Sequence, residues 1–313
     1  GEPVANATVA VEADGNDTYA GAGEYETDET GTVVLPAPSE EVTVTVTATD
    51  ENDTVTTTTE LEPPESVGPF GQVVSAFVDA LKGAGIVVTN TPDVLSDATA
   101  ELAMLLMLGA ARHAMRGDRI VRQGGWDSWS PSFMVGKQVT GARLGIVGMG
   151  RVGRAFAEKA RGFGMEIHYH NRSRLAREAE HGAIFHEDVD SLLEVADFLS
   201  LHCPATPETT DLLNATRIAR LPEGAVVVNT ARGALVDEAA LLAAIESGHL
   251  AAAGLDCFKV EPGGNPAFAR HENIFMLPHI GSATRKTRDA MGFRALDNLD
   301  AFFAGQEPQD RLV

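Results

Sequence analysis

Apolar and polar residues alternate with a period of two along the first sixty residues of the chain. Residues 42–47 are the clearest case, because three valines and three threonines fall on opposite faces of an extended segment. This pattern is typical of a half-buried antiparallel strand. Shorter runs at 8–12 and 32–35 repeat it, and turn-forming residues separate the runs. We therefore predict a small all-β, sandwich-like domain over residues 1–62.

A different pattern begins after Pro63-Pro64, which we interpret as part of a linker over residues 63–90. Short apolar runs now alternate with helical patterns, which predicts an α/β fold with a doubly wound parallel sheet, the Rossmann fold. We assign residues 91–285 to this nucleotide-binding domain and 286–313 to a C-terminal helix and tail. The strands are predicted at 142–147, 166–170, 198–202, 225–229, 252–255 and 274–277, and the helices at 154–162, 191–195 and 238–247.

Acidic residues are concentrated in the first of these regions. The chain has 313 residues, with 45 Asp+Glu against 24 Lys+Arg and a formal net charge of -21. Residues 1–81 contain 17 of the acids and no base, so this region carries -17 and the rest of the chain -4. A nucleic-acid partner is not expected, because it needs a basic face. The acidic, lysine-poor composition suits a salt-rich, halophilic cytoplasm.

Cysteine content and targeting patterns narrow the class of protein further. Only Cys203 and Cys257 are present, which excludes a disulfide scaffold and a cysteine-rich zinc site. No apolar run approaches the ~18 residues of a membrane span, and no signal peptide is recognised, so we expect a cytoplasmic protein that does not bind membranes. Asn-x-Thr triplets at Asn6, Asn16 and Asn52 indicate either glycosylation after export or a segment rich in both residues.

A glycine-rich motif links the first predicted strand of the second region to its helix. The strand at 142–147 continues into Gly148-Met149-Gly150-Arg151-Val152-Gly153. Gly148 would allow a tight turn, Gly150 would let the backbone approach a pyrophosphate, and Gly153 would let the helix pack on the strand. The positive end of the helix would then face the phosphates. The motif predicts a bound dinucleotide.

The next predicted strand ends where a dinucleotide's adenosine ribose would lie. An acidic residue at this place would hold the 2′-hydroxyl of NAD, but the sequence is Asn171-Arg172-Ser173-Arg174. Two arginines and a hydroxyl could bind a 2′-phosphate, so we predict NADP(H), with NAD(H) as the alternative. A loop with both arginines facing solvent would also explain the sequence.

Three charged residues follow later strands, where the functional groups of such a sheet are expected. Arg232 could grip a substrate carboxylate with two hydrogen bonds, and His279 could move the hydroxyl proton while hydride moves. A carboxylate partner, Glu261, would fix the tautomer of His279. Each also has a structural interpretation: Arg232 as a cap, Glu261 as the start of a turn, and His279 as a buried histidine. No metal is predicted, because no metal-ligand spacing is found at His168, His170, His181, His186 or His249.

Several runs occur together, in one order, along the second region. They are 85–92, 97–101, 126–131, 144–153, 202–204, 229–235, 254–256 and 278–284. With these runs, the chain from about Gly85 to Phe303 resembles the D-isomer-specific 2-hydroxyacid dehydrogenases, particularly the glyoxylate/hydroxypyruvate reductase branch.

The resemblance implies a role for individual residues. Arg232 would bind a 2-oxo acid, His279 would donate the proton for its reduction, and Glu261 would be the partner of His279. Trp126 and Trp129 fall on a segment that packs at a homodimer interface near the partner's substrate pocket, although ordinary interface or core aromatics fit as well. The implied cofactor-binding residues are Gly148, Gly150, Arg151, Val152, Gly153, Asn171, Arg172, Ser173, Arg174, Cys203, Pro204, Thr209, Thr230, Asp256 and Gly281.

The N-terminal region departs from this family. The family's own N-terminal region supplies most of a second, flavodoxin-like substrate domain and a loop that holds the substrate carboxylate. Here an acidic segment takes its place, with a weak resemblance to Ig-like or carboxypeptidase-regulatory-like surface modules. Ser75 and Ala76 are predicted to be a remnant of the substrate loop, with 66–68 as another candidate.

Three functions fit the sequence. The first is an NADP(H)-dependent reductase of a small 2-oxo acid such as glyoxylate or hydroxypyruvate. The second is a truncated or fused chain that binds NADP(H) with little or no catalysis, because substrate recognition needs both walls of a cleft. The third is a surface binding module based on the β-rich region.

Overall fold

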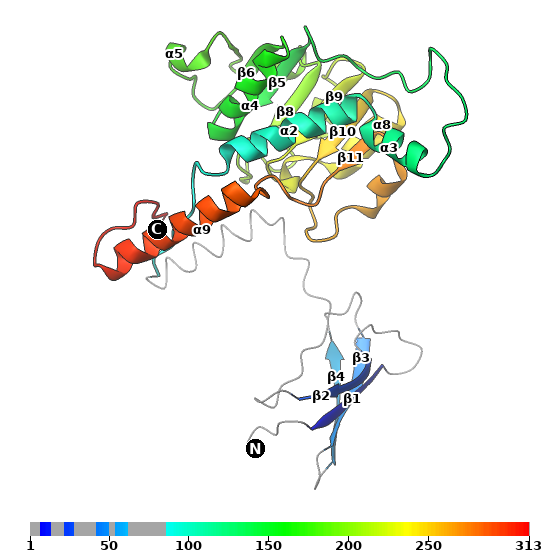
Figure 1. Cartoon of the computed structure of the whole chain (residues 1–313), viewed down its shortest axis with the longest axis vertical. Helices are drawn as coiled ribbons and strands as arrows, with labels where there is room; N and C mark the ends of the chain where they lie inside the picture. The colour runs from blue at the N-terminus through cyan, green and yellow to red at the C-terminus, as the bar shows by residue number, and fades with distance from the viewer. Residues whose placement is uncertain (1–6, 14–21, 28–41, 50–53, 62–85, 313) are drawn as a thin grey trace. The chain divides into compact units, whose positions relative to one another are not determined.

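The chain divides into two compact units, Gly1–Val67 and Gly68–Val313. A computed structural model describes residues 7–13, 22–27, 42–49, 54–61 and 86–312, shown as ribbons in Figure 1.

The first unit contains a four-stranded antiparallel sheet in the order β2-β1-β3-β4. The predicted alternation is seen in β3, where Val44 is fully buried with Val9 and Val11 while threonines occupy the other face. The hydroxyl of Thr45 lies 3.1 Å from that of Thr58 on the neighbouring strand. The strands are β1 (Thr8–Ala13), β2 (Gly23–Glu26), β3 (Val42–Thr49) and β4 (Thr54–Leu61).

The described residues of this unit form one sheet, whereas a sandwich consists of two facing sheets. The prediction of an antiparallel β region is therefore confirmed, without a second sheet among these residues. Other expectations lie outside the described residues. They are the strand at 32–35, the linker prolines, the candidate substrate residues Ser75 and Ala76, and the asparagines Asn6, Asn16 and Asn52.

The second unit is built on a seven-stranded parallel sheet in the order β11-β10-β9-β8-β5-β6-β7, which confirms the predicted parallel sheet; the strand β7 was not predicted (Figure 1). Its central strands β8 and β9 are buried along their whole length, because helices cover both faces. All five residues of β9, for example, are buried. The strands are β5 (Arg143–Val147), β6 (Glu166–His170), β7 (Ile184–Phe185), β8 (Phe198–Leu201), β9 (Ala225–Asn229), β10 (Leu250–Leu255) and β11 (Ile274–Met276).

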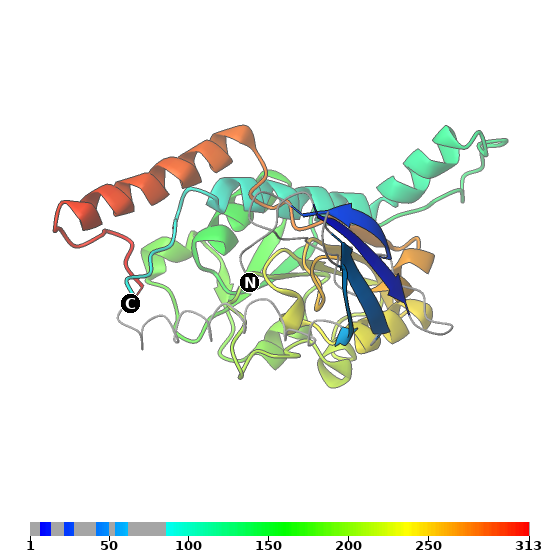
Figure 2. The same ribbon diagram turned by 90° about the horizontal axis from the view of Figure 1, so that it is seen from below.

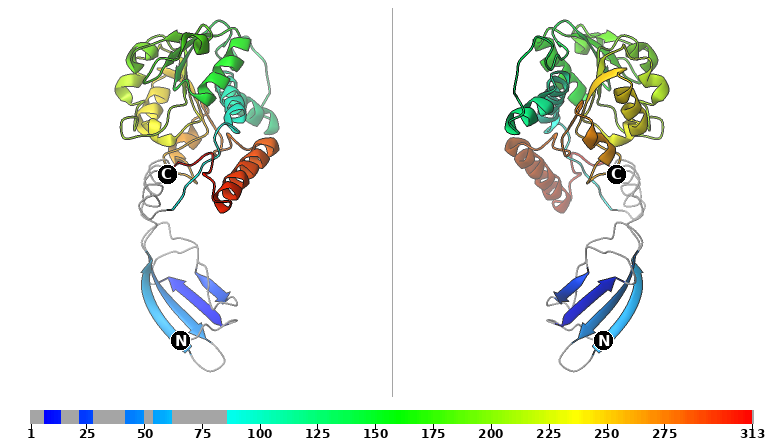
Figure 3. Two further views of the ribbon diagram at one scale, coloured as in Figure 1. Left: turned by 90° about the vertical axis from the view of Figure 1, so that its left-hand side faces the viewer. Right: turned by 90° about the vertical axis from the view of Figure 1, so that its right-hand side faces the viewer.

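Helices lie on both sides of this sheet, as Figure 3 shows from two directions. One buried cluster joins the sheet to α2 and α4, and another joins it to α6, α7 and α8. The helices are α2 (Ser96–Ala111), α3 (Ala114–Arg122), α4 (Arg151–Gly162), α5 (Arg177–Glu180), α6 (Val189–Leu193), α7 (Ala215–Ile218), α8 (Glu238–Glu246) and α9 (Arg285–Phe303). In the described part of the chain no helix has the length and apolarity to cross a membrane.

The order of strands reverses between β5 and β8, since β6 follows β5 on one side while β8 begins the series on the other. Ligands of open α/β sheets bind beyond the carboxyl ends of the strands at such a switch point. The loops after Val147 and Leu201 meet there, and the backbone N–H of His202 donates to the carbonyl of Val147 at 2.8 Å.

Two peripheral elements expose apolar side chains. α3 and the segment that follows it extend from the body of the second unit, at the end opposite α9 (Figure 2). Trp126 and Trp129 on this segment are 58% and 73% exposed. Exposed apolar residues also run along α9, at Phe293, Leu296, Leu299, Phe302 and Phe303.

Candidate active site

The glycine-rich loop after β5 has the close contacts that its sequence predicts. Gly148 has a φ of +99°, and a Cβ atom there would lie 2.5 Å from the backbone nitrogen of Cys203. A Cβ on Gly153 would overlap the carbonyl oxygen of Gly148, whereas nothing lies within 4 Å of a Cβ built on Gly150. The loop thus leaves open space at Gly150, just before α4 begins at Arg151.

The end of β6 is fixed against this loop. The side-chain oxygen of Asn171 accepts a hydrogen bond from the backbone N–H of Met149 at 2.6 Å. Arg174 points elsewhere: its guanidinium forms two hydrogen bonds, of 2.7 and 3.1 Å, with Glu180. Arg174 holds the pKa of the Glu180 carboxyl below its usual value. Arg172 and Ser173 are exposed, and no hydrogen bond or ion pair joins their side chains to other described residues.

A cleft of about 720 Å³ opens at the carboxyl ends of the strands and brings nine of the predicted site residues together. It contains both a predicted cofactor region and two of the three predicted catalytic side chains. The predicted residues that line it are Arg151, Val152, Cys203, Pro204, Thr230, Arg232, Asp256, His279 and Gly281.

Thr230 in this cleft provides a test of whether a dinucleotide fits. It is 7% exposed, and its hydroxyl oxygen has no hydrogen-bond partner among the residues that the structure describes. A buried hydroxyl without a partner is costly, and a polar ligand group in the cleft would satisfy it. With the open backbone at Gly150, this fits a dinucleotide such as NADP(H).

Arg232 follows β9 and is positioned by a residue that the sequence did not single out. Asn229 is 1% exposed; its side-chain oxygen accepts from the N–H of Ala231 at 3.0 Å, and its amide donates to the carbonyl of Arg232 at 2.8 Å. The guanidinium of Arg232 remains exposed in the cleft. The sequence feature that could have indicated Asn229 is a polar residue at the end of an otherwise apolar strand.

Asp256, after β10, fixes the loop that carries His279. Its carboxylate accepts hydrogen bonds from the backbone N–H groups of Ile280 and Gly281, at 2.9 and 2.8 Å. Burial raises the pKa of Asp256. His279 itself has a φ of +52°, a left-handed conformation that residues other than glycine seldom adopt. The two hydrogen bonds to Asp256 hold the loop in this conformation.

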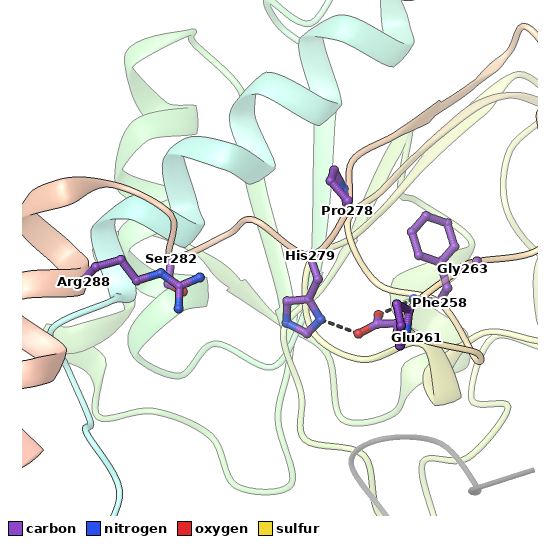
Figure 4. A pocket seen from close by; sticks show the side chains of 9 residues that line it. Phe258, Glu261, Gly263, Pro278, His279, Ser282 and Arg288 are labelled. Carbon is purple, nitrogen blue, oxygen red and sulfur yellow. Dashed lines mark hydrogen bonds and ion pairs between the residues drawn. The ribbon is translucent and has the colours of Figure 1, made fainter. Parts of the chain in front are cut away.

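Glu261 and His279 form the predicted pair (Figure 4). The Nδ1 atom of His279 lies 2.5 Å from a carboxylate oxygen of Glu261, and the other oxygen of Glu261 accepts from the N–H of Phe258 at 2.7 Å. The loop of Glu261 is held in turn by Glu238, whose carboxylate accepts from the N–H of Lys259 at 2.8 Å and the amide of Asn265 at 2.9 Å. No sequence pattern indicated this role of Glu238.

A second hollow of about 490 Å³ adjoins the cleft, since His279 and Ser282 line both. Figure 4 shows Phe258 and Pro278 on one side of His279, and Ser282 and Arg288 on the other. An acid bound by Arg232 and His279 would therefore have apolar walls and a further cation nearby.

Two predicted residues lie elsewhere. Thr209 closes the turn after β8: its hydroxyl donates to the carbonyl of Pro204 at 2.8 Å and accepts from the N–H of Thr206 at 2.7 Å. Trp129, with Trp126, lies on the projecting segment and does not line the cleft. Ser75 and Ala76 lie outside the described residues.

Comparisons with known proteins identify relatives of this chain. Residues 104–281 match the family model described as D-isomer specific 2-hydroxyacid dehydrogenase, NAD binding domain. The chain is 46% identical to a glycerate dehydrogenase of Hyphomicrobium methylovorum over 74% of this chain and 72% of the relative. It is 42% identical to a glyoxylate reductase of Thermococcus litoralis over 72% of this chain and 69% of that relative.

Two solved structures are also similar to this chain. A D-isomer specific 2-hydroxyacid dehydrogenase from Polaromonas is 50% identical, with a TM-score of 0.73 over 75% of this chain and 74% of that one. An NADPH-dependent glyoxylate/hydroxypyruvate reductase from Sinorhizobium meliloti, solved with NADP and malonate, is 35% identical, with a TM-score of 0.69 over 75% and 73%.

Proposed function

Because the chain belongs to the D-isomer-specific 2-hydroxyacid dehydrogenase family, an oxidoreductase family that uses NAD(P)H, we propose that it reduces glyoxylate or hydroxypyruvate with NADPH. The observation that carries this proposal is the placement of Arg232 and the His279–Glu261 pair beside the glycine-rich loop. Both relatives named for glyoxylate or hydroxypyruvate reduction support the substrate class.

The glycine-rich loop and α4 would hold the pyrophosphate, and Thr230 and Asp256 would lie beside the nicotinamide. When bound, NADPH supplies the hydride that adds to the carbonyl carbon of the substrate. Arg172, Ser173 and Asn171 would favour the 2′-phosphate, because the loop after β6 carries no carboxylate at residues 171–174 and the Arg172 side chain is exposed. Arg174 is bound to Glu180 and is not assigned this role.

Residues of this chain are assigned the binding of the substrate and the transfer of the proton. Arg232 binds the substrate carboxylate and orients the carbonyl oxygen. His279, protonated on both ring nitrogens, donates the Nε2 proton to that oxygen as negative charge develops on it. Glu261 accepts the Nδ1–H hydrogen bond, which orients the ring and stabilises its protonated form. After the transfer, His279 is neutral and keeps its Nδ1 proton.

The second unit would pair with another copy through the segment after α3. This segment exposes Trp126, Trp129, Phe133 and Val135, an apolar concentration that a partner surface would cover. Light scattering of the intact chain tests the homodimer, and Trp129→Glu should shift the measured mass toward that of the monomer.

A salt-rich cytoplasm is proposed from the net charge of -21, and greater thermal stability of the protein in molar KCl would support this proposal.

The decisive experiment follows NADPH oxidation by metal-free protein with glyoxylate and with hydroxypyruvate. Turnover with either acid, at a higher kcat/KM for NADPH than for NADH, is expected. The second candidate function, NADP(H) binding without catalysis, is favoured by the quarter or more of each relative that has no match in this chain. Tight NADPH binding by calorimetry without turnover of any small 2-oxo acid would establish that function instead.

A further inference from the structure

The His279–Glu261 pair has a neighbour that its proposed acid–base role does not use. The Sγ atom of Cys257, a carboxylate oxygen of Glu261 and a ring nitrogen of His279 all lie within 4.8 Å of one another. Over the described ranges of the chain, no other group of three His, Cys, Asp or Glu side chains is gathered in this way. Cys257 is 2% exposed, and its thiol donates to the carbonyl of Ala231 at 3.4 Å.

We propose that Cys257, Glu261 and His279 form an inhibitory binding site for Zn²⁺ or a similar soft divalent cation. One sulfur, one oxygen and one nitrogen donor form a set that zinc accepts, with water as a fourth ligand. The site goes beyond the reductase activity, and only its inhibitory effect rests on that proposed function.

The geometry requires small movements. Bond lengths of about 2.0–2.3 Å place neighbouring ligand atoms of tetrahedral zinc about 3.5 Å apart. The His279 and Glu261 atoms, now 2.5 Å apart, must separate by about 1 Å, and Cys257 must approach by a similar amount. One oxygen of Glu261 accepts the hydrogen bond from the N–H of Phe258, which leaves the other oxygen to bind the ion. The ion therefore takes the place of the hydrogen between Glu261 and His279.

Binding exchanges protons for the ion and transfers no electrons. Cys257 releases its thiol proton to solvent, and the doubly protonated ring of His279 releases its Nδ1 proton and keeps the one on Nε2. The thiolate and the Glu261 carboxylate then balance the two positive charges of the ion. The carboxylate no longer stabilises a protonated ring, and proton donation to the substrate stops.

The types of ligand atom in this group, and not the burial of Cys257, favour a soft cation. Burial, with the nearby carboxylates of Glu261 and Asp256, raises the pKa of the Cys257 thiol, so an ion must compete with a proton for the sulfur. Zn²⁺ and Co²⁺ accept thiolate and imidazole ligands, whereas Mg²⁺ and Ca²⁺ prefer oxygen. Mg²⁺ should therefore not inhibit at the same concentration.

The test uses the intact chain, treated with EDTA and dialysed, without nucleotide or substrate. Co²⁺ should produce a thiolate-to-cobalt charge-transfer band in the unmodified protein and in Cys203→Ala, which removes the other cysteine. Cys257→Ala and Cys257→Ser should lose the band, and the serine variant keeps a hydroxyl that can donate to Ala231. Calorimetry with Zn²⁺ should show a loss of affinity above the ~10–100-fold that outer-shell changes cause.

Each result decides between the two cysteines. A band that persists in folded Cys257 variants, a band that disappears in Cys203→Ala, or no band in the unmodified protein overturns the site. Circular dichroism confirms that each variant is folded. If metal-free protein shows no turnover, the reductase proposal fails while the cobalt spectrum still decides the metal site. If it turns over, Zn²⁺ should inhibit it and EDTA should restore the activity.

Discussion

The two sheets of this protein differ in how many of their faces are covered. In the seven-stranded sheet, helices cover both faces, and a strand such as β9 is buried along its whole length. In the four-stranded sheet, Val44 is buried on one face while Thr45 and Thr47 pair on the other with Thr58 and Thr56. Coverage thus determines whether a strand is continuously apolar or alternating.

The same difference separates the places where polar groups can act. In the covered sheet, Asn229 ends β9 and Asp256 directly follows β10, and both are 1% exposed with their hydrogen bonds made. They position the loops of Arg232 and His279. In the smaller sheet, the described threonine pairs are exposed and bond to one another. Proposed catalysis therefore belongs to the covered sheet.

Replacing His279 is the strongest test of that assignment. His279→Gln keeps a side chain of similar size but removes the donated proton, so kcat/KM for NADPH-dependent reduction should fall by about 10²–10⁴-fold. Thr45→Ala in β3 is the control, since it changes the smaller sheet. Steady-state kinetics measures both, and a comparable loss in the Thr45 variant would contradict the division.

The two arginines after β6 provide a sharper test within the covered sheet. Arg172→Ala should reduce the NADPH-to-NADH preference by about 10–100-fold, since a hydrogen bond to a charged group contributes about 1.5–3 kcal/mol. Arg174→Ala should mainly lower the melting temperature, because it leaves the nearly buried Glu180 without its ion-pair partner. If Arg174→Ala alone changes the preference, the assignment is reversed.

A matched pair of valines compares the two cores directly. Val44 and Val227 are both 0% exposed, one in each sheet. Val227→Ala should cost roughly 2 kcal/mol of unfolding free energy because its cavity lies inside a large cluster, and Val44→Ala roughly 1 kcal/mol. When unfolding by denaturant is measured through the loss of NADPH-dependent activity, only Val227→Ala should shift the transition. Equal losses of activity would show that the units are coupled.

His202, at the switch point, gives the covered sheet a pH dependence. Burial lowers its pKa from 6.5 to about 4. Between these values the unfolded chain binds a proton that the folded chain does not, so stability falls as pH decreases through this window, by up to about 1 kcal/mol per pH unit. Well above pH 6.5, where the imidazole is neutral in both the folded and the unfolded chain, the residue contributes no slope. Thermal melts should show a shallower acid slope for His202→Gln, and an unchanged slope would refute the linkage.

A glycine on an exposed helix should give the smallest effect, and a glycine on a covered helix should give an opposite and larger one. Gly292, within α9, has nothing within 4 Å of a built Cβ, so Gly292→Ala should stabilise by ~0.5–1 kcal/mol through helix propensity. The same change at Gly109 in α2 would bring a Cβ against the ring of Phe275 and should destabilise by ~1–3 kcal/mol. Melting temperatures of the two variants should move in opposite directions.

Local patterns predicted much of the nucleotide-binding unit. β6 and β9 have the predicted bounds, because clear loop residues follow each of these strands. The glycine-rich loop was predicted because its three glycines, the strand before them and the helix after them are adjacent in the sequence. α2 was not predicted, since it is apolar on most sides and gives no amphipathic period.

The features that could not be predicted depend on contacts between residues far apart in the sequence. Arg174 could not be assigned to Glu180 from sequence, because the pairing depends on how the chain turns after β6. The same holds for Glu238, which reaches residues more than twenty positions away, and for Cys257 beside His279. Their positions follow from the sheet that brings separate loops to one edge, not from spacing along the chain.

The exposed apolar row on α9 has a practical consequence for handling the protein. Phe293, Leu296, Leu299 and Phe302 are each about half exposed or more. Salts such as ammonium sulfate are excluded from protein surfaces and strengthen the burial of apolar groups. The chain should therefore bind a phenyl column at moderate ammonium sulfate concentrations, despite its net charge of -21. Replacing Phe293 with glutamate should make it elute earlier, so that retention measures this one helix surface.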